Sequence, residues 1–93
     1  MTDLATTVPA SFSIPPSPMR RIAEEVAHKH GLTLEQLKSR TQDHKIAHAR
    51  QEAMWRMYEE AGKSNLKIAL FFHMANHTTV IHARRAHERR LQG

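Results

Sequence analysis

The chain has 93 residues, no cysteine, few aromatic residues and a net charge of +5 at neutral pH. The lack of cysteine excludes a disulfide scaffold, thiol catalysis and the common structural zinc sites. The length allows one small domain, and few glycines together with five methionines favour an all-α fold with a flexible aliphatic core. The excess of positive charge favours a polyanionic partner.

Residues 1–18 are rich in Ser, Thr and Pro. Because proline lacks a backbone N–H and restricts the residue before it, we expect a disordered arm here and a folded domain over residues 19–93. The arm is either a flexible terminus or a docking peptide anchored by Phe12 and Ile14. The chain has no apolar run of membrane-spanning length and no signal-peptide pattern, so we expect a cytoplasmic protein.

Apolar residues spaced three and four apart predict helices over residues 19–30 and from Leu34 onward. Gly31 is a typical end for the first helix. Thr33 is a typical N-cap for the second, and Gln36 stands where a side chain can close a capping box.

A polar connection at residues 39–43 leads into the third and longest helix, predicted over residues 44–61. The broad apolar face of that helix makes it the one on which the others pack. Trp55 lies away from this face, and it either packs on a neighbouring segment or belongs to a protein interface. In a DNA-binding protein, the connection can contact the phosphate backbone or the minor groove. We assign that role to Arg40, Gln42 and Lys45.

Ser64 is the expected N-cap of the fourth helix, which runs to about Phe72. Leu66 and Leu70 lie one turn apart on its outer side. They either cover a neighbouring segment or form a small protein-contact patch.

Asn76 is the expected N-cap of the fifth helix, which begins with short polar side chains. A short helix, a short turn and a helix with a polar N-terminus are typical of a helix-turn-helix. The first turn has the chemistry to read base edges, and the basic residues behind it can hold phosphates. The expected base-reading residues are Asn76, His77, Thr78 and Thr79. The expected backbone contacts are Ser64, Lys67, His82, Arg85 and Arg89. The core seam of this helix is predicted to be Val80, Ala83, His87 and Leu91.

The string His-Thr-Thr-Val-Ile-His-Ala at residues 77–83 resembles the C-terminal DNA-binding domain of the bacterial replication initiator DnaA. The signature of that family ends in Asp-His-Thr-Thr-Val-Leu/Ile-His-Ala, and family-like residues extend over residues 21–91. They are Ile22, Val26, Ala27, Leu37, Ala49, Arg50, Gln51, Ala53, Met54, Ser64, Ile68 and Phe72. The resemblance implies an all-helical domain that binds duplex DNA at DnaA-box-like sites, with bases read by residues 76–79 and a phosphate held by Arg50.

Four departures from the family pattern affect which DNA sequence the domain should prefer. The turn at residues 73–75 reads His-Met-Ala where the family commonly has Gly-Gly-Arg, and Gln42 stands where an arginine often enters the minor groove. Tyr58 replaces a basic phosphate contact. Asn76 replaces an aspartate, so a side chain that only accepts hydrogen bonds becomes one that also donates. We therefore expect an altered and weaker sequence preference.

The function expected from these residues is double-stranded DNA binding without catalysis. The sequence has no nucleophile with a matching base, no Walker A loop for ATP and no cofactor motif. His44 and His48 are spaced as ligand pairs can be, but no third ligand accompanies them, so no metal is expected. The protein would be a stand-alone regulator or accessory factor of replication initiation, or a transcriptional regulator, in the bacterial nucleoid. It would bind one site as a monomer, with a dimer left open.

The alternative is a protein-interaction module that retains the fold and engages a replication initiation protein without specific DNA binding. On that interpretation the contacts would come from the arm, Trp55 and the two outer leucines.

Overall fold

The computed structural model describes residues 17–41 and 43–93, which form five helices and no strand. The prediction of an all-α domain of about five helices is confirmed, whereas the calls on Phe12, Ile14 and Gln42 lie outside the described residues. None of the described helices combines the length and the apolar character needed to cross a membrane. The helices are α2 (Pro18–Lys29), α3 (Leu34–Lys38), α4 (His44–Glu59), α5 (Asn65–Phe71) and α6 (His77–Gln92).

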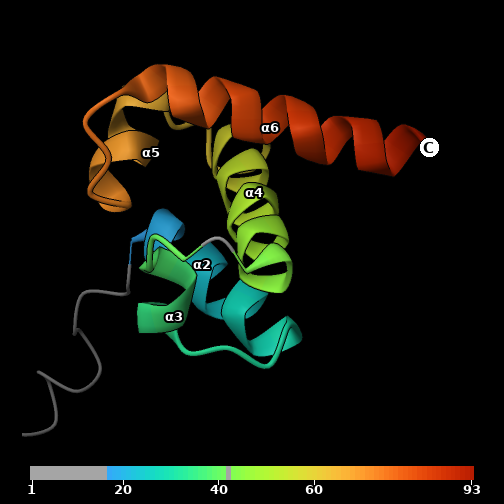
Figure 1. Ribbon diagram of the computed structural model, residues 1–93. Coiled ribbons are helices and arrows are strands. Elements are labelled where there is room, and N and C mark those ends of the chain that lie inside the picture. The colour runs from blue at the N-terminus through green and yellow to red at the C-terminus, as the bar shows by residue number, and fades with distance from the viewer. Residues whose placement is uncertain (1–16, 42) are drawn as a thin grey trace, which may run out of the picture.

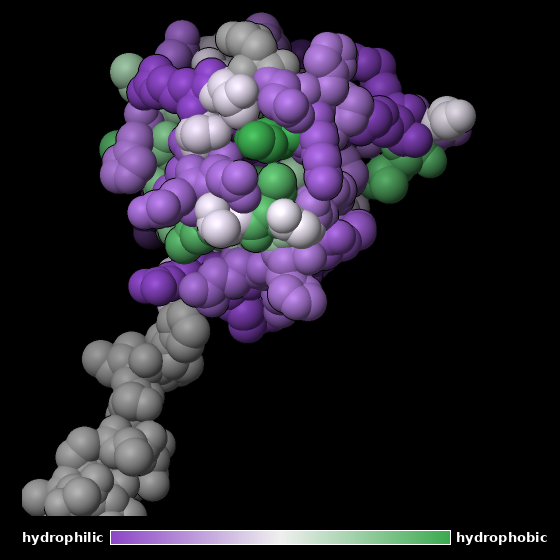
Figure 2. All heavy atoms as spheres, turned by 60° about the horizontal axis from the view of Figure 1, so that its bottom comes forward, coloured by the Kyte–Doolittle hydropathy of each residue, from purple (hydrophilic) through white to green (hydrophobic). Residues whose placement is uncertain are grey.

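Helix α4 is the centre of the fold, as its apolar face predicts, and it contacts each of the other four helices. Figure 1 shows α6 crossing one end of α4, with α5 beside the start of α6 and with α2 and α3 toward the other end. Polar residues cover most of the face at that other end, around a small apolar area (Figure 2). The buried apolar core is made of Ile22, Ala23, Val26, Ala27, Leu37, Ala49, Ala53, Met54, Met57, Ile68, Ala69, Phe72 and Val80.

The helix starts follow from local capping. The Thr33 hydroxyl accepts from the backbone N–H of Gln36, and the Gln36 side chain accepts from the backbone N–H of Thr33, so the predicted capping box is confirmed. Helix α2 begins at Pro18, inside the segment predicted to be the arm. Ser17 caps it, and a proline at the first helical position loses no hydrogen bond.

The ends of α2 and α5 share one motif. In α5 the His73 N–H donates to the Leu70 carbonyl and the Met74 N–H donates to the Ala69 carbonyl, which is the Schellman pattern. The motif needs a left-handed residue just after the helix, and in α2 that residue is Gly31 with φ of 70°. In α5 it is His73 with φ of 58°, so the turn predicted at residues 73–75 forms without glycine and at a steric cost.

A partly buried ionic cluster joins α2 to α4. Glu52 is only 9% exposed on the core side of α4. Its two carboxylate oxygens accept from Lys29 Nζ at 2.8 Å and pair with His30 Nε2 at 2.9 Å. Burial raises the pKa of Glu52, but these two hydrogen bonds together outweigh it and hold the pKa below its ordinary value. The cluster fixes the end of α2 against the middle of α4.

Two predictions were wrong, one about the end of a helix and one about the burial of a side chain. Helix α4 ends at Glu59 rather than at Ala61, because the chain already turns toward the left-handed Gly62. Leu91 is 60% exposed rather than buried in the α6 seam. The helical period is correct there, but the end of α6 extends beyond α4, so Leu91 does not reach the core (Figure 1).

Candidate nucleic-acid interface

Helices α5 and α6 form a helix-turn-helix around the residue 72–76 connection. The side chain of Asn76 caps α6, because its amide oxygen accepts from the Thr78 N–H at 2.8 Å. The predicted N-cap is thus confirmed. Because the amide oxygen is used in the cap, the Asn76 side chain can form further hydrogen bonds mainly as a donor.

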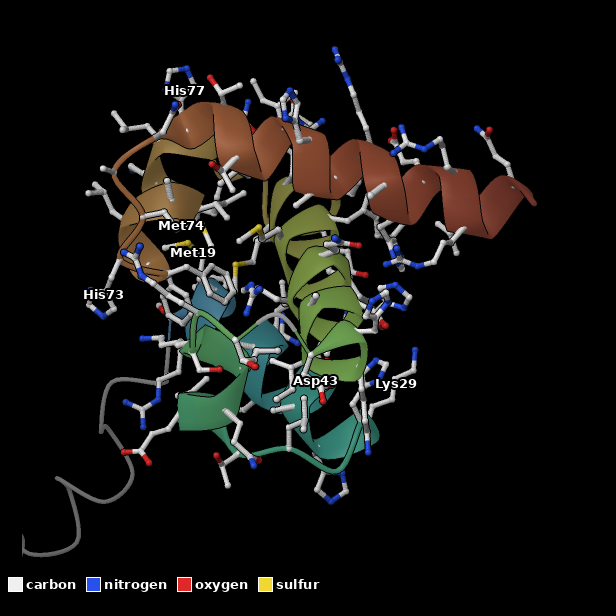
Figure 3. All side chains as sticks on the ribbon, viewed as in Figure 1. Met19, Lys29, Asp43, His73, Met74 and His77 are labelled. Carbon is white, nitrogen blue, oxygen red and sulfur yellow. The ribbon has the colours of Figure 1, made fainter. Side chains whose placement is uncertain are left out.

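The first turn of α6 faces solvent. We call Asn76, His77, Thr78 and Thr79 the reading turn, and all four residues are exposed. Figure 3 shows the His77 side chain pointing away from the body of the protein, on the side of α6 opposite α2 and α3. The reading turn therefore presents an amide, an imidazole and two hydroxyls at a helix N-terminus, which carries partial positive charge. These groups can bond both base edges and phosphates.

A basic stripe continues the reading turn along the outer face of α6. His82, Arg85 and Arg89 follow Thr78 at spacings of four, three and four residues, which places them on one helix face. All three are exposed, and among the described residues no acidic side chain lies within ion-pair distance of either arginine. The stripe is thus available to hold phosphates along a groove.

Two other arginines of α6 are used inside the protein. Arg84 donates to Asn65 Oδ1 at 3.0 Å, and its guanidinium carbon lies 3.4 Å from the centroid of the Tyr58 ring. Arg90 donates to Gln51 Oε1 at 2.7 Å. Arg84 therefore joins α6 to α4 and α5, and Arg90 joins α6 to α4, so two of the four arginines of α6 make intramolecular bonds and the other two lie on the basic stripe.

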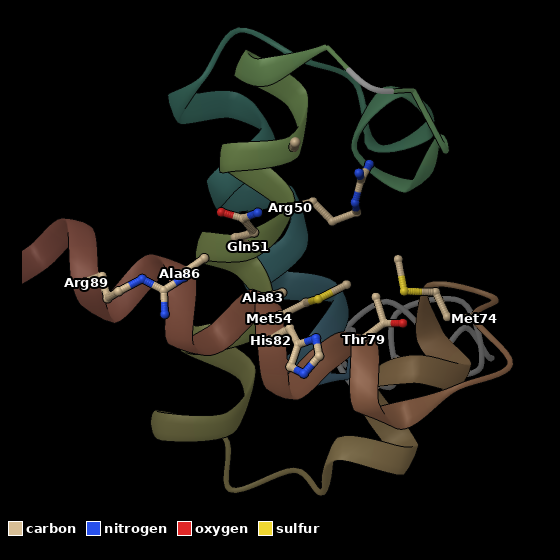
Figure 4. A pocket seen from close by; sticks show the side chains of 10 residues that line it. Arg50, Gln51, Met54, Met74, Thr79, His82, Ala83, Ala86 and Arg89 are labelled. Atoms are coloured by element: carbon tan, nitrogen blue, oxygen red, sulfur yellow. The ribbon is translucent and has the colours of Figure 1, made fainter.

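A groove runs between α4 and α6, beside the basic stripe (Figure 4). Arg50 lies on the α4 wall and His82 and Arg89 lie on the α6 wall. Arg50 is half-buried, and its guanidinium donates to the carbonyls of Ser39 and Thr41. Burial lowers its pKa, but the group remains charged. These bonds give Arg50 an intramolecular role, and the phosphate contact that the resemblance implies stays a prediction.

The connection before α4 lies next to the reading turn. The exposed Arg40 donates from Nη2 to the His73 carbonyl oxygen at 2.7 Å. Lys45, in the first turn of α4, is also exposed. Together the loop and the reading turn line a hollow made by Arg40, Arg50, Met74, Ala75, Asn76 and Thr79.

The start of α5 is polar, whereas its outer face exposes two leucines. The Ser64 hydroxyl caps α5 by accepting from the backbone N–H of Lys67, whose side chain is exposed. Leu66 and Leu70 are 57% and 63% exposed, as the helical pattern predicts. Trp55 is half-buried: its ring centroid lies 5.2 Å from that of His87, so it packs on α6, and an interface role for its exposed part stays a prediction.

The histidines do not gather into a site. The His44 and His48 rings stand edge to face with centroids 6.0 Å apart. Within residues 17–41 and 43–93, no three His, Asp or Glu side chains are grouped closely enough to hold a metal ion.

Sequence reasoning did not identify the contacts between residues that are distant in the sequence. The Arg40–His73 and Arg84–Asn65 bonds link residues 33 and 19 positions apart, and no local pattern indicates such pairs. Glu52 did carry a signal. It is a charged residue on the apolar face of α4, directly before Ala53, and a carboxylate there requires a buried partner.

A family model described as the helix-turn-helix of the bacterial dnaA protein matches residues 19–86, which is well over half of the chain. No curated protein and no solved structure matches the chain significantly. The matched segment contains all of α3 to α5 and the part of α6 that bears the reading turn and Arg85. The chain therefore belongs to the bacterial DnaA helix-turn-helix family and is a DNA-binding domain.

Proposed function

We propose that the protein binds double-stranded DNA at DnaA-box-like sites through the reading turn of α6. It would act there as a regulator or accessory factor of replication initiation, or as a transcriptional regulator, with one domain on each site. The observation that carries this proposal is the exposure of all four reading-turn residues beside the basic stripe. A helix N-terminus of this kind fits the major groove, where its first turn meets base edges.

Each part of the surface would have its own role. The reading turn would discriminate bases, and the basic stripe would hold phosphates with help from Lys67 at the start of α5. Lys45 would approach the backbone from the loop side. Because Asn76 uses its amide oxygen as a cap, its contact with DNA would be made mainly through the amide N–H groups. Such a donor suits guanine O6 and N7 or thymine O4.

A titration of two duplexes tests the proposal. One contains a DnaA-box-like site and the other a scrambled sequence, and fluorescence anisotropy is followed at several salt concentrations. Specific binding predicts a preference for the site and a log–log salt slope of several units, since each phosphate contact contributes about 0.9.

Two substitutions separate base reading from phosphate binding. Thr78→Ala should remove about 1–3 kcal/mol of discrimination, while Thr78→Ser should keep most of it because the hydroxyl remains. Arg85→Ala should weaken both duplexes about equally and lower the slope by about one unit. Arg21→Ala removes an exposed arginine from α2, away from α6, and should change neither quantity (Figure 1). Equal affinity for both duplexes at every salt concentration would refute sequence-specific binding.

The alternative is a protein-interaction module, and one specific observation favours it. The outer face of α5 leaves Leu66 and Leu70 more than half exposed, four residues apart. Such a pair can anchor a small apolar contact with a replication initiation protein. Leu66→Gln with Leu70→Gln would abolish that contact and leave DNA binding unchanged. Binding of this variant to a replication initiation protein, measured beside the DNA titration, distinguishes the two functions.

A further inference from the structure

The turn between α5 and α6 holds a left-handed residue where another turn of the same motif uses glycine. His73 has φ of 58°, a conformation in which the Cβ of an L-residue crowds the following carbonyl. Helix α2 ends in the same motif, but its left-handed residue is Gly31, which has no Cβ. The turn before α6 therefore needs a stabilising contact that the turn after α2 does not need.

Arg40 makes a contact with this residue. Its Nη2 donates to the carbonyl oxygen of His73 at 2.7 Å, and a charged donor strengthens such a bond. The segment that carries Arg40 is itself anchored. Arg50 donates to the carbonyls of Ser39 and Thr41, one on each side of Arg40 in the sequence. Arg40 thus extends from a fixed segment onto the turn.

The turn leads directly into the reading turn. The Met74 N–H closes the motif on the Ala69 carbonyl at 2.8 Å, and Asn76 caps α6 only three residues after His73. Arg40, Met74 and Asn76 also line the same hollow. Any change in the backbone of His73 therefore moves the start of α6 relative to α4.

We propose that Arg40 is a positioning residue that holds His73 in its left-handed conformation and thereby orients the reading turn toward the bases. The part that concerns DNA rests on the function proposed above. In this role Arg40 affects DNA through the backbone of His73 and not through a contact of its own. Its removal therefore lowers discrimination between DNA sequences. A phosphate contact at the same position would instead strengthen binding to every sequence.

Four proteins test this role: the wild type, Arg40→Ala, His73→Gly and the double variant. Amide hydrogen exchange of Met74, measured by NMR without DNA, reports on the turn directly. Arg40→Ala should speed this exchange roughly three- to tenfold, because the strained turn opens more often. The double variant should return to the wild-type rate, since glycine adopts the left-handed conformation without that strain. Lys45→Ala removes a nearby charge without touching the turn and should leave the rate unchanged.

The same proteins are then titrated with the site and scrambled duplexes. Arg40→Ala should lose about three- to tenfold of the preference for the site, and the double variant should regain it although it still lacks the arginine. Lys45→Ala should weaken both duplexes equally. An unchanged Met74 exchange rate in Arg40→Ala, or no recovery in the double variant, overturns the positioning role. If the wild type shows no preference at all, the proposed function fails, and the exchange rates alone decide the role of Arg40.

Discussion

The ionic cluster at Glu52 allows the sharpest test of how the domain is held together. Glu52→Gln keeps the size of the side chain and removes its charge, so the carboxylate bonds to Lys29 and His30 are lost or weakened. Glu52 is almost fully buried, but Lys29 is 64% exposed, and solvent screening reduces the stabilisation that the Lys29–Glu52 ion pair contributes. We therefore expect the free energy of unfolding to fall by about 1–2 kcal/mol. For a domain of this size, the melting temperature should fall by about 5–15 °C.

The matched control is Glu24→Gln, which removes the same charge from an exposed pair. Glu24 lies 3.2 Å from Arg20 within α2, with side chains 47% and 60% exposed. Its loss should lower the free energy of unfolding by less than about 0.5 kcal/mol. Both variants are compared by chemical denaturation followed by circular dichroism. Equal effects of the two substitutions would refute the claim that the Glu52 cluster fixes α2 to α4.

The difference in the free energy of unfolding between the wild type and Glu52→Gln should also depend on pH. The folded pKa of Glu52 lies below its ordinary value of 4.5, so the stabilisation is fully present above that value. It is lost as the pH falls through the folded pKa. The difference between the wild type and Glu52→Gln should therefore narrow below about pH 4.5. A difference that stays constant into acid would mean that the charge of Glu52 contributes nothing.

Three further predictions concern the rest of the domain. Burial lowers the pKa of His87 below 6.5, and the charge of Arg90 acts in the same direction against a raising effect of Glu52, so the unfolded chain binds a proton more readily. Stability should consequently fall as the pH drops below about 6.5, and His87→Phe should flatten this dependence in denaturation curves. Met57→Ala should cost about 2–5 kcal/mol in the same assay, whereas Leu91→Ala should cost less than about 0.5 kcal/mol because Leu91 is exposed. Ser64→Ala should cost about 1 kcal/mol through the lost α5 cap, and a cost near zero would show that the cap is dispensable.

The sequence by itself determined the helices and their starts, because these depend on interactions within a few residues. Thr33 with Gln36 and Asn76 with Thr78 cap their helices as the residue types predict. The resemblance to the DnaA domain likewise came from a contiguous string of residues, and the family match confirms it.

Only the tertiary structure decided which side chains remain free to act. Arg84 and Arg85 are neighbours in sequence, yet the fold binds the first to Asn65 and leaves the second exposed. The pairing of Arg40 with His73 likewise depends on how the loop before α4 meets the turn before α6. The physical reason is common to both cases: helical period sets the direction of a side chain, whereas its partner depends on the packing of distant segments.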